Sequence, residues 1–145
     1  MKALLQRVKQ ASVKVNDELV GEIQSGLLVF LGVEKNDTEE SCLKLLEKVV
    51  SYRIFADDQG KMNKSLLQVH GELLVVSQFT LVADTKKGLR PSFSSAGSPD
   101  EGRRLYEVFI SGAEERGVKV GVGQFGADMQ VALVNDGPVT FMLEN

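Results

Sequence analysis

The sequence predicts an α+β fold: a single compact, strand-rich domain in which a barrel-like mixed or antiparallel sheet is accompanied by two amphipathic helices. Most apolar residues alternate with polar ones or form short continuous runs, as in strands, and only two segments repeat their apolar residues with a helical period. The 145 residues contain no internal repeat and no linker rich in proline, glycine or serine. We therefore expect one domain that spans residues 1–145.

The first 35 residues are expected to form strands joined by short turns. The segments with a strand pattern are residues 4–8, 11–15, 18–23 and 26–33. The last of them is a continuous apolar run, which is typical of a fully buried strand. Asn16 and Asp17 supply one turn, and the sequence QSG at 24–26 supplies the next.

The first helix is predicted to follow Asp37. Asp37 and Glu40 have the spacing of a capping box, which marks a helix N-terminus. Apolar residues then recur along one helical face, at Cys42, Leu45, Leu46, Val49 and Val50. Because Cys42 lies on this stripe, we interpret it as a small core residue rather than a nucleophile.

The second helix is predicted within residues 98–117. Ser98 is the expected N-cap, Pro99 takes the first helical position, and Glu101 completes a capping box. Gly117 is the expected C-terminal cap, because helices commonly end on a glycine in the left-handed conformation.

Strand patterns occupy the remaining segments. They cover residues 72–83, 118–122, 129–134 and 139–143. Between the last two, the sequence NDGP at 135–138 predicts a tight hairpin turn, because Asn, Asp and Gly tolerate positive φ. Pro138 is unexpected in such a turn, since it cannot donate a backbone N–H to the ladder and it restricts Gly137.

Composition and charge restrict the class of protein. Hydrophobic residues make up 43% of the chain and charged residues 26%, so disorder is not indicated. A single cysteine cannot form an internal disulfide, no signal peptide is visible and no apolar stretch could cross a membrane, so we expect a cytoplasmic protein without a membrane partner. The net charge of −3 argues against a protein that coats nucleic acid through bulk electrostatics. Lys86, Lys87 and Arg90 nevertheless form a local basic cluster, for which a solvated loop is the plain alternative.

The sequence lacks the residues for a metal site. One histidine and one cysteine cannot supply the three or four nitrogen and sulfur ligands of a zinc site. No phosphate-binding glycine motif and no nucleophile elbow are present, and His70 is expected in a loop or on the surface. We therefore expect neither a metal nor a cofactor.

The sequence SQFTL at 77–81 interrupts an otherwise apolar strand with polar residues. Strand side chains alternate between faces, so Gln78 and Thr80 would share one face. Two interpretations stay open. The strand could simply leave the core, with Thr80 favoured by its β-propensity, or the segment could form the floor of a site whose amides and hydroxyls hold a substrate carbonyl.

The sequences SQFTL and NDGPVT together resemble the paired motifs of the D-aminoacyl-tRNA deacylase (D-tyrosyl-tRNA deacylase) family, whose members clear D-amino acids from mischarged tRNA. The similarity continues, in order and spacing, through MKALLQRVKQASVKV, GEIQSGLLVFLGV, KGLRPSF and the final strands, and so covers essentially the whole chain. Leu89 in KGLRPSF departs from a position that is more often polar in the family, which affects only local loop contacts.

The resemblance implies a homodimer with its active site at the subunit interface. Gly137 and Pro138, a cis pair in the family, would reach from one subunit into a pocket built by the other. The residues that the resemblance assigns to this pocket are Ser77, Gln78, Phe79 and Thr80. Arg7 matches a family arginine thought to brace the Gly-Pro pair. These roles would explain the proline that follows the glycine.

The reaction that the resemblance implies is hydrolysis of the ester between an amino acid and the terminal ribose of tRNA. L-aminoacyl groups would be rejected, and glycine mischarged on alanine tRNA would be accepted. Amides near Phe79 and Thr80 would stabilise the oxyanion. Thr80 would position rather than attack, because no activating base is evident and the adjacent ribose hydroxyl would help to activate water. Lys86, Lys87 and Arg90 would contact tRNA phosphates.

Two alternatives stay open at this stage. The first is a noncatalytic nucleic-acid-binding module on the same scaffold, against which the intact motifs weigh. The second is a hydrolase for another small acyl ester. Release of amino acid from charged tRNA, compared with hydrolysis of simple esters, distinguishes all three.

Overall fold

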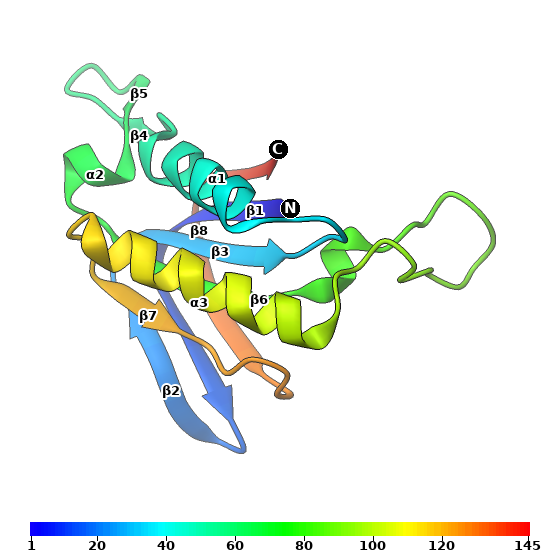
Figure 1. The fold of residues 1–145 in the computed structure, drawn as a ribbon. Helices are drawn as coiled ribbons and strands as arrows, with labels where there is room; N and C mark the ends of the chain where they lie inside the picture. The colour runs from blue at the N-terminus through cyan, green and yellow to red at the C-terminus, as the bar shows by residue number, and fades with distance from the viewer.

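The long first strand, β1 (Lys2–Val15), organises the sheet because it pairs with three other strands. Its N-terminal half pairs antiparallel with β3 (Gly26–Gly32) and its C-terminal half with β2 (Glu18–Ile23). Its other edge pairs antiparallel with β8 (Gln130–Glu144). The computed structural model describes all residues, 1–145 (Figure 1).

Two parallel pairings extend the sheet on the far side of β3. β6 (Glu72–Ser77) pairs with β3, and β7 (Val120–Val122) pairs with β6. β2 then approaches β7 so closely that a Cβ atom on Gly21 would lie 2.1 Å from the carbonyl oxygen of Val122. The sheet is therefore mixed and almost closed on itself, which confirms the predicted barrel-like, strand-rich fold.

Both predicted amphipathic helices are present and lie side by side over one face of the sheet (Figure 1). They are α1 (Glu39–Ser51) and α3 (Pro99–Glu115), and the stripe predicted for the first helix is buried. The helices pack closely at Gly112, where a Cβ atom would lie 2.6 Å from Cδ2 of Leu46. No helix of the structure is long and apolar enough to span a membrane.

The first helix begins one residue later than predicted. Thr38 is its N-cap and forms the capping box with Ser41, so the predicted Asp37–Glu40 box is wrong. Asp37 instead accepts a hydrogen bond from the amide of Glu34 at 2.7 Å. Threonine is among the residues preferred as N-caps, and the contact to Glu34 holds Asp37 outside the helix.

The second helix begins as predicted, with Ser98 as the N-cap accepting from the amide of Glu101 at 3.2 Å. The side chain of Glu101 does not complete the box, because it pairs with Arg104. The helix ends at Glu115, and Gly117 follows in the left-handed conformation with φ +79°.

Several elements differ from the sequence-based prediction. The strand predicted over 72–83 ends at Ser77 and is followed by a 3-10 helix, η1 (Phe79–Val82). A short helix and a two-stranded sheet were not predicted: α2 (Leu66–Val69), β4 (Phe55–Ala56) and β5 (Met62–Lys64). They occupy the connection between α1 and β6, where the elements are too short for a clear period.

The hairpin turn predicted at residues 135–138 is wrong, because β8 runs through this segment as one strand. The ladder with β1 is instead interrupted there: Thr140 pairs with Gln6, and Asn135 pairs with Val8. The four residues 136–139 thus stand opposite Arg7 alone and form a large bulge in β8. The residues that favour a turn serve here to bend the strand outward.

The lone cysteine and the lone histidine take the positions that the sequence indicates. Cys42 is fully buried, its thiol donates to the carbonyl of Leu105 at 3.3 Å, and burial raises the pKa of the thiol to about 12. His70 is exposed at the C-terminal end of α2, in the left-handed conformation. Cys42 therefore lacks the exposed, electropositive environment of a nucleophilic cysteine.

Candidate active site

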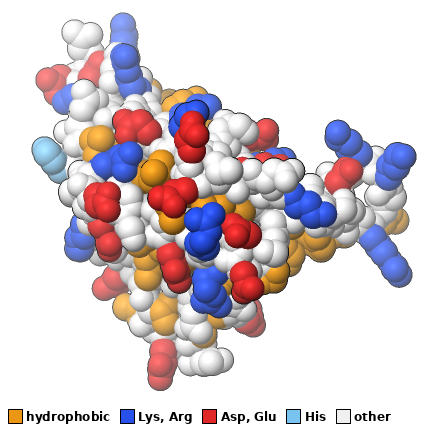
Figure 2. Space-filling view, in the orientation of Figure 1, with side chains coloured by type: hydrophobic (Ala, Val, Ile, Leu, Met, Phe, Trp, Pro, Cys, Tyr) orange, Lys and Arg blue, Asp and Glu red, His pale blue; other side chains and the backbone are white.

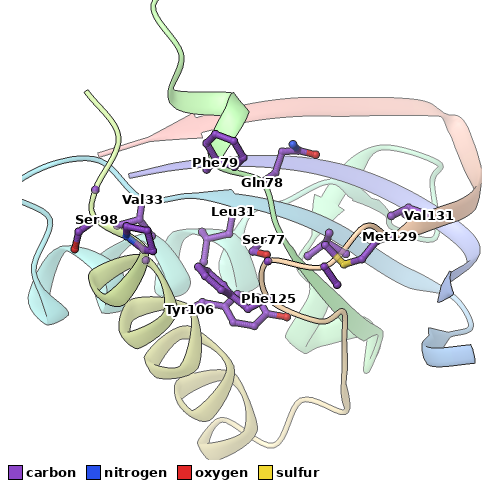
Figure 3. A pocket seen from close by; sticks show the side chains of 16 residues that line it. Leu31, Val33, Ser77, Gln78, Phe79, Ser98, Tyr106, Phe125, Met129 and Val131 are labelled. Carbon is purple, nitrogen blue, oxygen red and sulfur yellow. The ribbon is translucent and has the colours of Figure 1, made fainter. Parts of the chain in front are cut away.

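A cavity of about 480 Å³ opens where β6 ends. Its lining comes from four segments: the end of β3, the end of β6, the start of α3, and residues 125–131 (Figure 3). The lining is mostly apolar, with few polar groups. Such a cavity excludes water from a small ligand and is typical of a ligand-binding site.

The SQFT segment forms one rim of this cavity. Ser77, Gln78 and Phe79 line it, whereas Thr80 does not. Gln78 and Thr80 nevertheless lie together, because the side-chain amide of Gln78 donates to the hydroxyl of Thr80. The expectation that these two side chains share a side is met, but the cause is the turn into η1 and not strand alternation.

The backbone amides of Phe79 and Thr80 lie at the start of η1. The first N–H groups of a helix have no partner within that helix, and Gln78 provides no side-chain cap here. The backbone amide of Gln78 already has a partner, since it donates to the carbonyl of Leu31 at 2.8 Å. Phe79 lines the cavity, so the start of η1, whose first amides have no partner within the helix, lies at the cavity rim.

Phe79 is an exposed aromatic side chain at the cavity rim. It is 60% exposed, and its ring lies 5.0 Å from that of Phe93, measured between centroids. Phe93 is 40% exposed, so the two rings form an exposed apolar patch, which is typical of a surface that binds another molecule.

The inner wall of the cavity consists of residues that sequence reasoning did not single out. Tyr106 on α3 donates its hydroxyl to the carbonyl of Val75 at 2.9 Å, and burial raises the pKa of this phenol to about 12. Its ring lies 5.8 Å from that of Phe125, and the guanidinium of Arg103 lies 4.8 Å above the Phe125 ring. Gly102 admits Phe125, because a Cβ atom there would lie 3.3 Å from the ring. In the sequence, Tyr106 resembles any inward-facing helix residue, so no signal marked it.

Arg7 connects the bulge in β8 to the rest of the fold. Its Nε donates to the carbonyl of Asp136 at 3.1 Å, and its Nη1 donates to the carbonyl of Ile54 at 2.7 Å. The carboxylate of Asp136 lies 3.6 Å from Nε of Arg7 and 3.6 Å from Nζ of Lys9. The side chain of Arg7 is only 16% exposed, so these contacts hold the bulge from its inner side.

Gly137 and Pro138 are exposed at the tip of this bulge, and the bond between them is cis. Gly137 has φ +134°, and a Cβ atom on it would lie 3.1 Å from Nη2 of Arg7. Neither of the two residues, nor Arg7, lines the cavity beside Ser77. Within one chain, the two motifs therefore do not form a single site.

The basic cluster lies on a loop that projects from the fold between η1 and α3 (Figure 1). Lys86, Lys87 and Arg90 are all exposed, and Lys and Arg side chains gather at the tip of this loop in Figure 2. Paired backbone hydrogen bonds between Asp84 and Ser92, of 2.8 and 3.0 Å, close its base. The cluster is thus separate from the cavity but accessible to a large partner.

The acidic, histidine and cysteine side chains do not gather into a group of three or more that could hold a metal ion.

Comparisons with known proteins connect these features to a family. The family model described as D-Tyr-tRNA(Tyr) deacylase matches residues 4–144. Curated proteins named D-aminoacyl-tRNA deacylase, from Shewanella denitrificans and Shewanella baltica, are 62% and 61% identical over 144 residues, which is 99% of both chains.

Two solved structures share the fold over nearly the whole chain. The structure named c-Myc DNA Unwinding Element Binding Protein has a TM-score of 0.94 and 37% identity, and the match covers 100% of this chain and 99% of that one. A structure described as a probable eukaryotic D-amino acid tRNA deacylase shares the fold, with a TM-score of 0.83 and 21% identity over 98% of this chain and 97% of that one. By its sequence over nearly its whole length, the chain belongs to the D-Tyr-tRNA(Tyr) deacylase family.

Proposed function

We propose that the protein is a hydrolase that cleaves the ester bond of D-aminoacyl-tRNA and releases free D-amino acid and tRNA. Family membership over residues 4–144 carries this proposal, and the apolar cavity with amide donors on its rim supports it. Charged tRNA is made and used in the cytoplasm, so we infer that the protein acts there.

The proposed chemistry depends on stabilising the negative charge that develops on the carbonyl oxygen during acyl transfer to water. Preorganised backbone donors in a water-excluded site are the usual means. The amides of Phe79 and Thr80 are our candidates, since they begin η1 without a side-chain cap. The ribose hydroxyl next to the ester would help to activate the attacking water.

Thr80 is proposed to position the substrate or water rather than to attack. A threonine nucleophile needs an adjacent base. The hydroxyl of Thr80 accepts a hydrogen bond from the side-chain amide of Gln78, and an amide is not a base. Ser77 and Gln78 are proposed to hold the substrate through the rim that they share with Phe79.

We propose that the active site is completed by a second copy of the chain. The separation of the cavity from the bulge supports this, because Gly137 and Pro138 are exposed and do not line the cavity of their own chain. Exposed apolar side chains on β8, Val134 at 48% and Met142 at 44%, offer surface for a homodimer on this strand. In the dimer, the bulge of one subunit would enter the cavity of the other.

Chiral selection would follow from exclusion. The Gly137–Pro138 backbone would fill the space into which an L side chain projects, whereas a D side chain would point elsewhere. Glycine has no side chain to exclude, so glycyl-tRNA, as formed on alanine tRNA, would also be a substrate.

Lys86, Lys87 and Arg90 are proposed to contact the phosphates of the tRNA. Their exposure and their loop's projection support contacts that position the tRNA without reading its bases. The structural relative named a DNA-binding protein keeps open a nucleic-acid-binding role without catalysis. The full-length identity to named deacylases favours catalysis.

The test is release of labelled amino acid from D- and L-aminoacyl-tRNA carrying the same amino acid, with a simple amino-acid ester as a third substrate. We expect fast hydrolysis of the D-aminoacyl-tRNA alone, unaffected by prior chelation. Binding of tRNA without hydrolysis would indicate the noncatalytic alternative. Equal hydrolysis of the simple ester would indicate a general esterase, and loss on chelation with rescue by zinc would contradict the metal-free mechanism.

Thr80→Ala is expected to slow deacylation about tenfold and to leave it easily measurable, because general positioning effects are smaller than loss of a nucleophile. Single-turnover kinetics on D-aminoacyl-tRNA would measure this, with Thr80→Ser as the variant that keeps the hydroxyl. A trapped acyl-threonine, or a fall to background in folded Thr80→Ala, would contradict the positioning role.

A further inference from the structure

The bulge in β8 lacks the ladder pairs with β1 that hold the rest of the strand. β8 pairs with β1 on both sides of the bulge, through Thr140 with Gln6 and Asn135 with Val8. Between these pairs, residues 136–139 have only Arg7 opposite them. Arg7 holds the carbonyl of Asp136 but makes no hydrogen bond to the C-terminal side of the bulge. Another group must hold that side.

The side chain of Asn135 supplies the missing contacts. Its Oδ1 accepts from the backbone amide of Val139 at 3.0 Å, and its Nδ2 donates to the hydroxyl of Thr140 at 3.0 Å. One residue before the bulge therefore bonds to two residues after it. The span of Asp136, Gly137 and Pro138 is thereby closed across its base.

The second contact is fixed from β1. Gln6 donates from its Nε2 to the same hydroxyl of Thr140, at 3.2 Å. The hydroxyl thus accepts from both side chains, and β1 and the two ends of the bulge are joined in one network. Val139 is 7% exposed, so its amide would have poor access to water if Asn135 were removed.

The chemistry requires an amide side chain at position 135. The group must accept a hydrogen bond from a backbone N–H with one atom and donate to a hydroxyl with the other, which asparagine does at this reach. An apolar side chain would do neither. A bulge closed by such contacts has its tip preorganised rather than mobile.

We propose that Asn135 and Thr140 form a polar clamp that positions Gly137 and Pro138 for chiral selection. This inference rests on the proposed function, because the bulge is a positioning element only if its tip enters a substrate site. Asn135 does not touch the substrate in this account. It acts through the bulge, as Arg7 does from the opposite side.

The experiment compares Asn135→Ala, Thr140→Val and the double variant with the unaltered protein. Asn135→Ala is expected to lower kcat/KM for D-aminoacyl-tRNA by about tenfold to a hundredfold, because small displacements of a positioning group have effects of this size. The effect should lie mainly in kcat. The ratio of D- to L-hydrolysis should also fall, which a general loss of folded protein would not cause.

Changes at Thr140 test whether its hydroxyl matters, and the double variant tests whether the two residues act together. Thr140→Ser keeps the hydroxyl and should retain selectivity, whereas Thr140→Val should lose part of it. The double variant should lose less than the sum of the two single changes, since both break one network. Gln130→Ala, an exposed change on the same strand, is the matched control and should have no effect.

Amide hydrogen exchange at Val139 tests the clamp independently of activity. Exchange should rise at least about tenfold in Asn135→Ala, because the hydrogen bond that protects this amide is lost. Unchanged exchange, or an unchanged D-to-L ratio in an active protein, would overturn the proposal. If the unaltered protein does not cleave D-aminoacyl-tRNA, the proposed function and the positioning role both fail. The exchange test would then still report whether Asn135 holds the amide of Val139.

Discussion

Arg7→Ala is expected to reduce kcat/KM for D-aminoacyl-tRNA by about a hundredfold or more, because the group that holds the bulge from inside is removed. Arg7 joins the carbonyl of Asp136 to the carbonyl of Ile54 through two different nitrogens. Loss of these charged hydrogen bonds should also lower the free energy of unfolding by about 2 kcal/mol or more. Deacylation kinetics and urea denaturation would measure the two effects.

The controls for Arg7→Ala separate geometry from charge. Arg7→Lys keeps the positive charge, but a single ammonium group cannot reproduce the two-sided guanidinium contact, so it should recover little activity. Lys14→Ala removes an exposed cation from the same strand and should change neither measurement. Full D-activity in folded Arg7→Ala would show that the bulge is not part of the site.

Gly137→Ala is expected to have an effect of similar size on activity and a small one on stability. A Cβ atom at Gly137 would lie 2.7 Å from Cγ2 of Val139 and 3.1 Å from Nη2 of Arg7, at a φ that side chains rarely adopt. The bulge tip must therefore shift, which should lower D-activity and weaken rejection of L-aminoacyl-tRNA. Paired D and L rates would measure both.

Gly60→Ala is the matched control for this prediction. Gly60 also has positive φ, at +77°, but a Cβ atom there would meet nothing within 4 Å, and it lies in an exposed turn outside the cavity. It should lose some stability and keep its selectivity. If Gly137→Ala behaved in the same way, the tip of the bulge would not be the chiral filter.

The elements predicted well from the sequence are those with strong local signals. α3 carries Ser98 and Pro99 at its start and Gly117 after its end, and these residues act through the backbone nearest to them. The continuous apolar run of β3 likewise reflects burial on both faces. In both cases local preference and tertiary packing agree.

The errors arise where long-range pairing decides the structure. Residues 135–138 have ideal turn chemistry, yet β1 is long enough to pair with β8 on both sides of them, so the segment becomes a bulge and not a hairpin. Residues 77–81 could continue as a strand by their pattern, but β6 ends and η1 begins. Neither outcome depends on the local sequence alone.

The candidate site was predicted only in part. Ser77, Gln78 and Phe79 were identified, because polar residues in an apolar strand are unusual and the motif resembles that of a known family. Tyr106 and Phe125 were missed, since they meet only when α3 and the segment after β7 pack against each other. Aromatic residues in such positions have the same pattern as ordinary core residues.

The measurement that tests the composite site most directly uses a dimer with a different lesion in each subunit. One subunit carries Arg7→Ala, which disables the bulge, and the other carries Ala127→Phe, which fills the cavity. Each homodimeric variant should be inactive. Two different affinity tags allow the mixed dimer to be purified from coexpressed chains.

In the mixed dimer, the intact cavity of one subunit faces the intact bulge of the other. One of the two sites is then complete, and we expect about half of the unaltered dimer's D-aminoacyl-tRNA hydrolysis, with L-aminoacyl-tRNA still rejected. If each site were built within one chain, every site would carry a lesion. A mixed dimer as inactive as the two homodimers would contradict the account.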